Sequence, residues 1–142
     1  MERVHKLNGR VVCVACLLAL VAACSGGNKQ LSKTDIQLAA GDLRSFAAST
    51  QMLVEECTAR RATETFCQEQ AELLSNKVED ALRELKGQGG PAENERQQLS
   101  DIGVRLREIV VRVEQSASVL TDAADAERLA NTAKTLEDGL RR

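Results

Sequence analysis

Between residues 32 and 142, apolar residues recur at intervals of three and four positions, and polar residues fill the positions between them. This spacing gathers the apolar side chains on one face of an α-helix, because the helix has about 3.6 residues per turn. The pattern is interrupted near residues 58–63, 87–91 and 121. We therefore expect an all-α fold, in which an antiparallel bundle of three to four helices forms the domain.

The first helix has a well-marked start. Ser32 and Asp35 have the spacing of a capping box, and Leu31 and Ile36 occupy the positions of a hydrophobic staple. Its apolar stripe then continues for about six turns, through Ile36, Ala39, Ala40, Leu43, Phe46, Ala47, Thr50, Leu53, Val54 and Cys57.

The second helix follows a stretch without apolar periodicity, at 58–63. Thr63 is a candidate cap for it, and Thr65 with Gln68 is a rival capping box. We expect the helix to end near Gly87, which adopts a left-handed conformation at low cost. Its stripe comprises Phe66, Cys67, Ala71, Leu74, Val78, Ala81, Leu82 and Leu85.

The break at 87–91 contains the single proline of the chain, Pro91, which suits the first turn of a third helix. A further apolar stripe after residue 121 is out of phase with the third helix by about one residue. Thr121 or Asp122 is expected to cap a separate fourth helix there; the alternative is one long helix that kinks near 121. Pairs four residues apart are expected to form ion pairs on the helix surfaces: Glu79–Arg83, Asp101–Arg105 and Glu108–Arg112.

The composition agrees with helices. The chain has no Trp or Tyr and only two Phe, whereas strands favour aromatic and β-branched residues. Ala, Leu, Glu, Gln and Arg, which favour helices, dominate instead.

The first residues follow a different pattern. A basic start with Arg3, Lys6 and Arg10 precedes an uncharged apolar run at 11–23. A membrane-spanning helix needs about 20 residues, so this run is too short to span a bilayer. Its length fits the apolar part of a secretory signal peptide, which is about 7–15 residues long.

The end of that run, Val21-Ala22-Ala23-Cys24, resembles the lipobox of bacterial lipoproteins, in which an aliphatic residue and two small residues precede a cysteine. The resemblance implies cleavage before Cys24, attachment of a diacylglycerol to its thiol, and acylation of the new amine by a fatty acid such as palmitate. The expected organisation is a signal peptide at 1–23, a tether at 24–31 and a helical domain at 32–142.

A lipidated Cys24 would hold the domain at a membrane surface in the cell envelope, facing the periplasm, because two or more acyl chains give stable anchoring. Ser25 takes the position where Asp, in enterobacteria-like systems, retains a lipoprotein at the inner membrane. Its identity favours the outer membrane.

Cys57 and Cys67 are the only other cysteines that remain after cleavage. If one helix contained both, their Cα atoms would lie about 15 Å apart, whereas a disulfide needs about 4.4–6.8 Å. Disulfides persist outside the cytoplasm. We expect a disulfide at a turn between the first two helices; the alternative is two buried free thiols.

Little in the mature chain indicates catalysis. The only histidine is His5, inside the signal peptide, so neither imidazole catalysis nor imidazole metal ligation is expected. No phosphate-binding or dinucleotide motif occurs. We expect no catalytic residues, no metal site and no cofactor.

Cleavage would remove three of the 19 basic and one of the 21 acidic residues, which leaves a net charge of −4. Without a basic stripe or aromatic residues, nucleic-acid binding has no support. The preferred interpretation is a non-catalytic interaction or scaffold module that binds an unidentified envelope protein. The alternative is a bundle that binds a small apolar ligand or senses stress.

Overall fold

The computed structural model describes residues 29–118 and 120–142, and it is all-helical over those ranges. The four α-helices are α2 (Lys33–Thr58), α3 (Glu64–Glu84), α4 (Glu93–Glu114) and α5 (Leu120–Leu140), and a short 3-10 helix, η1 (Gly90–Ala92), precedes α4. The all-α class is therefore confirmed. Over the same ranges the bundle has four separate helices, rather than three with a long kinked one.

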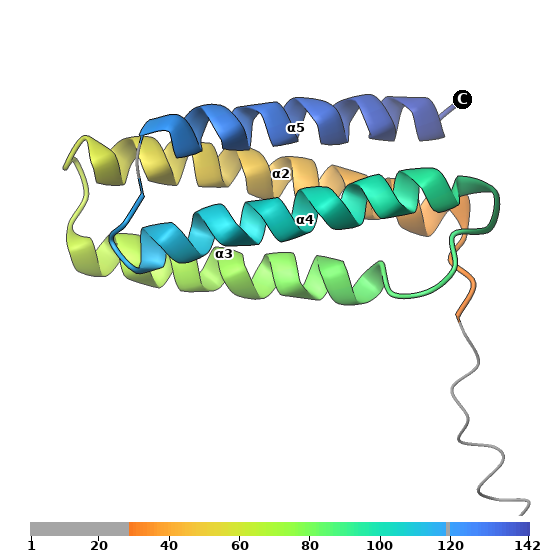
Figure 1. Cartoon of the computed structure of the whole chain (residues 1–142), viewed down its shortest axis with the longest axis horizontal. Coiled ribbons are helices and arrows are strands. Elements are labelled where there is room, and N and C mark those ends of the chain that lie inside the picture. Colours follow the sequence, from red (N-terminus) through yellow and green to blue (C-terminus); the bar gives the residue numbers. More distant parts are fainter. Residues whose placement is uncertain (1–28, 119) are drawn as a thin grey trace, which may run out of the picture.

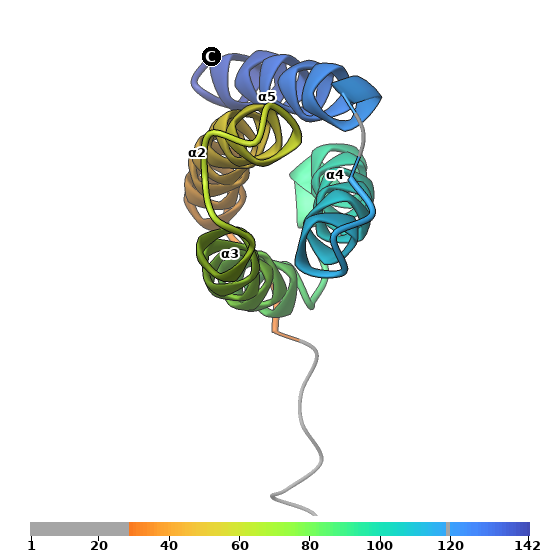
Figure 2. The same ribbon diagram turned by 90° about the vertical axis from the view of Figure 1, so that its left-hand side faces the viewer.

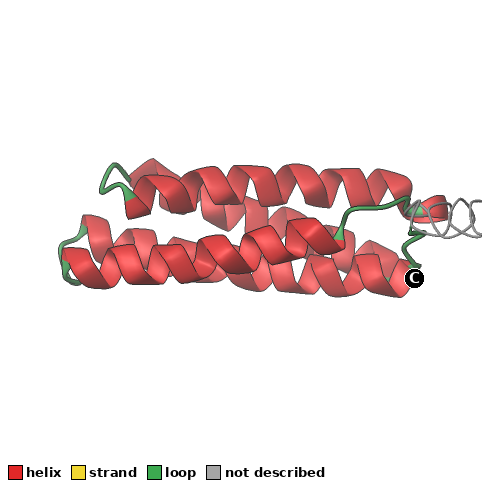
Figure 3. Ribbon diagram, turned by 90° about the horizontal axis from the view of Figure 1, so that it is seen from below, coloured by secondary structure: helices red, strands yellow, loops and turns green. Residues whose placement is uncertain are grey.

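The four helices pack side by side, as Figure 1 and the view from below in Figure 3 show. The end view in Figure 2 shows α2 between α5 and α3, with α4 beside α3. α2 packs most extensively against α5, and α3 packs most extensively against α4. The α2–α3 and α4–α5 connections lie at one end of the domain, and the α3–α4 connection lies at the other end with residues 29–32 and the C-terminus.

The start of α2 agrees with the sequence analysis. The Asp35 backbone N–H donates to Ser32 Oγ at 3.1 Å, and the Ser32 backbone N–H donates to Asp35 Oδ2 at 2.9 Å, which completes the capping box. The hydrogen bonds from Ser32 lower the pKa of the Asp35 carboxyl. Leu31 and Ile36 are both buried in the same apolar cluster, as the staple requires.

The predicted turn after Cys57 is also present. α2 ends at Thr58, and Arg60 takes a positive φ of 55°, so a non-glycine residue makes the left-handed step here. Thr63 caps α3, because its hydroxyl accepts a hydrogen bond from the Phe66 N–H at 3.3 Å. The rival cap, Thr65, lies inside the helix.

The connection from α3 to α4 uses glycine conformations. Gly87 has a positive φ of 149° and Gly90 one of 50°. Glu93 closes this loop: its carboxylate accepts hydrogen bonds from Arg96 Nη2 at 2.6 Å and from the Gly89 N–H at 2.6 Å. The hydrogen bond from Arg96, with a smaller contribution from Gly89, lowers the pKa of Glu93 to about 2.

The predicted caps of the fourth helix are wrong. α5 begins at Leu120, so Thr121 and Asp122 lie within its first turn. Asp122 is only 3% exposed, and it accepts a hydrogen bond from Arg112 Nη2 at 2.6 Å, which joins α4 to α5. This carboxylate also raises the pKa of the Arg112 guanidinium. Asp122, which was predicted as a helix cap, is therefore part of a buried contact between α4 and α5.

Two of the three predicted ion pairs within single helices, Glu79–Arg83 and Glu108–Arg112, are replaced by other partners, and the third, Asp101–Arg105, is not among the ion pairs of the described residues. Arg112 pairs with Asp122, Glu79 pairs with Arg107 across the α3–α4 contact at 2.6 Å, and Arg83 pairs with Asp80. Two of these three pairs join separate helices, which a spacing rule along one helix does not anticipate.

The core consists of three neighbouring clusters of aliphatic side chains. Small residues predominate where α2 meets α5, and this allows the two helices to approach closely. Large, fully buried residues fill the centre: Ile36, Leu43, Val54, Val78, Leu99, Leu106, Val110 and Val113. The buried hydroxyl of Thr50 donates to the Phe46 carbonyl at 2.8 Å, so a polar residue fits into the apolar stripe.

Candidate functional site: the disulfide end and the end that residues 29–31 enter

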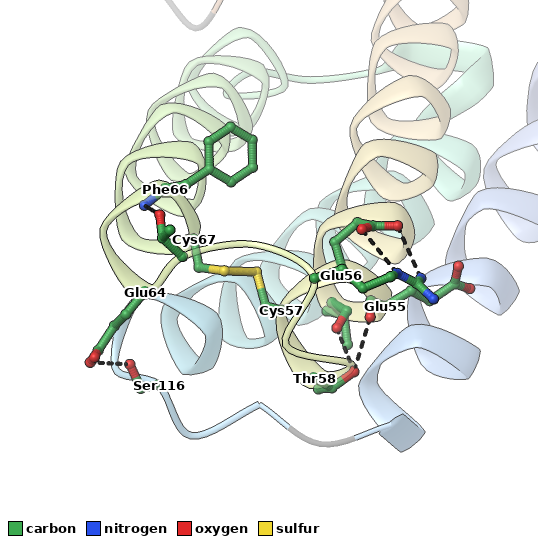
Figure 4. The surroundings of a disulfide bond; sticks show 11 residues. Glu55, Glu56, Cys57, Thr58, Glu64, Phe66, Cys67 and Ser116 are labelled. Carbon is green, nitrogen blue, oxygen red and sulfur yellow. Dashed lines mark hydrogen bonds and ion pairs between the residues drawn. A yellow bond between two sulfur atoms is a disulfide. The ribbon is translucent and has the colours of Figure 1, made fainter.

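The structure brings Cys57 and Cys67 to disulfide-bonding distance, with their Cα atoms 6.0 Å apart. This separation lies within the range of protein disulfides. Figure 4 shows the bond between the last turn of α2 and the first turn of α3. Cys67 is 6% exposed and belongs to the core cluster at this end of the domain. The pair therefore links the short turn to the packed interior.

Further polar contacts hold the same end together. Arg61 donates from Nε and Nη2 to the two carboxylate oxygens of Glu56, at 3.1 and 3.0 Å. The Thr58 hydroxyl donates to the Val54 carbonyl at 2.7 Å. These contacts hold the last turn of α2 and the residues that follow it.

The hydroxyl of Ser116, in the α4–α5 connection, donates to Glu64 at 3.0 Å (Figure 4). The two connections at this end of the domain are thereby joined, although Glu64 and Ser116 lie 52 residues apart in the sequence. Sequence spacing gives no signal for a contact of this range.

The opposite end holds the segment through which the chain enters the domain. The Leu31 N–H donates to the Gln88 carbonyl at 2.8 Å, and the Gln88 N–H donates to the Lys29 carbonyl at 3.1 Å. A Cβ on Gly87 would lie 2.3 Å from the Lys29 carbonyl oxygen, so only glycine permits this approach. Residues 29–31, which the sequence analysis assigned to the tether, are thus hydrogen-bonded to the α3–α4 connection.

The two deeply buried carboxylates among the described residues are both paired with arginine. Asp122 binds Arg112, as described above, and Glu137 on α5 binds Arg44 on α2 at 3.3 Å and also Arg141. Each carboxylate therefore links elements of the bundle, and the two belong to different contacts. Sequence reasoning missed both, because the partner on the neighbouring helix lies ten or more residues away in each case.

Within residues 29–118 and 120–142, no three His, Cys, Asp or Glu side chains lie close enough together to hold a metal ion. The helices in these ranges are all too short or too polar to cross a membrane. The predicted lipidation residue, Cys24, lies outside the described residues, as does the rest of the predicted signal peptide.

Comparisons with protein-family models, with curated proteins and with solved structures found no match. The functional interpretation therefore depends on the residues and contacts of this chain alone.

Proposed function

We propose that the chain is a bacterial envelope lipoprotein, whose antiparallel helical bundle is a non-catalytic interaction or scaffold module. Residues 1–23 are removed, Cys24 carries the acyl chains, and the bundle faces the periplasm from the outer membrane. The periplasm is an oxidising environment, so a disulfide between Cys57 and Cys67 persists there.

The observation that carries this proposal is the order of features before the bundle: a basic start, a short apolar run, two small residues and then Cys24. The structure supports it by the position at which the chain enters the domain. Residues 29–31 lie at one end, and the α2–α3 connection, which the disulfide closes, lies at the other (Figure 1). An anchor at Cys24 would leave the disulfide end accessible to a partner.

Replacement of the lipidated cysteine tests the proposal. Full-length chain with Cys24→Ala is expressed in a bacterium that processes lipoproteins, next to the native chain and a Ser25→Ala control. The native chain and the control should sediment with membranes and resist extraction by high salt. The Cys24→Ala chain should stay unprocessed or lose the lipid. If the native, Ser25→Ala and Cys24→Ala chains were all processed to the same form and partitioned equally into a detergent phase, the lipid anchor would be refuted.

The alternative function, a bundle that holds a small apolar ligand, receives less support from the packing. The centre of the bundle is filled by large side chains such as Leu43, Leu99 and Leu106. One hollow is open to solvent between α4 and α5 and is lined by charged side chains, among them Arg105, Glu108, Arg112, Asp125 and Arg128. Native mass spectrometry of the purified chain separates the two functions, because a ligand of constant mass that is retained after purification would favour the alternative.

A further inference from the structure

The face formed by α2 and α3 presents large apolar side chains to solvent near the disulfide end. Met52 is 68% exposed, Phe66 47% and Leu73 53%. These three line a groove of about 350 Å³, and Leu53 and Leu74 form part of its lining. Single exposed apolar residues are common on protein surfaces, but several along one groove mark an interaction surface. α5 and α4 pack on other sides of α2 and α3 (Figure 2), and no described element covers the groove.

Two opposite charges on α3 lie symmetrically about Leu73, whereas Glu56, which also lines the groove, pairs with Arg61. Lys77 lines the groove four residues after Leu73, and the ion pairs among the described residues do not include it. Glu69 stands four residues before Leu73, is exposed and also forms no ion pair with a described residue. The two opposite charges therefore lie at equal distances, about 6 Å along the helix axis, on either side of one apolar residue.

We propose that this face binds a second copy of the same chain, with α3 of one copy antiparallel to α3 of the other and a twofold axis at Leu73. Such an axis brings Lys77 beside Glu69 of the partner subunit, and it does so twice, because a twofold interface repeats each contact. Leu73 and the neighbouring Met52 of both copies then fill the centre, where apolar groups lose contact with water.

A different helical protein would need two properties to occupy the groove. It would need apolar side chains for the centre and an acidic side chain to meet Lys77. The exposed face of α3 already carries both, in Leu73 and Glu69. The described residues therefore support a second copy of the chain as the molecule that binds in the groove.

The size of the face indicates a weak dimer. α3 has 21 residues, so it extends for about 30 Å, and two neighbouring helices form a face about 18 Å wide. One copy would therefore contribute roughly 500–600 Å². This lies at the low end for specific complexes, so we expect a reversible dimer.

Crosslinking through the proposed axis gives a direct test, because one new thiol at position 73 then lies opposite its own copy. Full-length chain with Leu73→Cys is expressed in its host and exposed to a mild oxidant in whichever cell fraction contains it. A band of twice the monomer mass should form on a non-reducing gel and disappear with reductant. Val104→Cys is the matched control, since Val104 is 49% exposed on α4. On the same non-reducing gel, that variant and the native chain should run at the monomer mass, because neither places a thiol at the proposed axis.

Charge reversal separates a specific contact from a general loss of folding. In the Leu73→Cys chain, Lys77→Glu or Glu69→Lys alone should lower the crosslinked fraction about tenfold, because two attractive pairs become two repulsive ones. Both changes together should restore it.

The proposal would be overturned by the absence of a disulfide-linked dimer of the Leu73→Cys chain, by equal crosslinking of the Val104→Cys control, or by a failure of the double reversal to restore the crosslink. A crosslink between the Leu73→Cys chain and another protein, in place of the homodimer, would also overturn it. If the Leu73→Cys chain is crosslinked in the soluble fraction while the native chain, with its unmodified Cys24, is not, the result would refute the anchor and support this interface.

Discussion

Removal of the disulfide should destabilise the bundle by an amount that follows from the length of its loop. Cys57 and Cys67 are separated by 10 residues. The loop-entropy relation gives about 2.7 kcal/mol for a closed loop of this size. A domain of roughly 110 residues has an unfolding entropy of about 0.23 kcal/mol per kelvin near its melting temperature, so the loss corresponds to about 12 °C.

The assay compares thermal unfolding of the native chain and of the Cys57→Ala/Cys67→Ala variant by circular dichroism at 222 nm, each with and without reductant. The native chain with reductant should melt near the double variant, and reductant should not change the variant. Labelling of thiols in denaturant without reductant should modify neither Cys57 nor Cys67 of the native chain. A double variant that melts within about 2 °C of the native chain would refute the stabilising role, and labelling without reductant would refute the bond itself.

Two further predictions concern the end of the domain where residues 29–31 enter. Gly87→Ala should destabilise the chain by about 1–3 kcal/mol, because its positive φ and the adjacent backbone carbonyl exclude a Cβ; Gly139→Ala, which meets no atom within 4 Å on a helix, should be neutral or stabilising by up to about 1 kcal/mol. Chemical denaturation of both variants checks this, and equal stabilities would contradict it. Because the pKa of Glu93 is lowered from 4.5 to about 2, its interaction with Arg96 stabilises the fold above about pH 4.5 and is lost as the pH falls toward 2. Melting temperatures measured from pH 6 to pH 2 should therefore fall less steeply for Glu93→Gln than for the exposed control Glu72→Gln, whereas parallel curves would show that this pair does not contribute.

The features predicted well from the sequence are those decided by residues three or four positions apart. The Ser32–Asp35 capping box and the Thr63 cap are examples, because both depend on backbone groups of the same helical turn. The turn between Cys57 and Cys67 was predicted from the loss of apolar periodicity at 58–63, and helix geometry tied the disulfide to it, since a continuous helix holds residues ten apart too far from one another for a disulfide.

The features that the sequence analysis missed depend on how the helices are rotated against each other. Asp122 is an acceptable cap when α5 is considered alone, but in the packed bundle it faces Arg112 of α4. Glu79 likewise reaches Arg107 on the neighbouring helix rather than a residue of its own. The hydrogen bond between Leu31 and Gln88 was not predicted either, because α2 and α3 separate these two residues in the sequence.

The most direct test of the lipid anchor is the intact mass of the native chain after detergent extraction from its host membrane. The proposal requires a polypeptide that begins at Cys24 and carries the added mass of a diacylglycerol, with or without a third acyl chain on the amine. Fragmentation should place that mass on the first residue. A chain that retains residues 1–23, or one that begins at Cys24 without any added lipid mass, would contradict it.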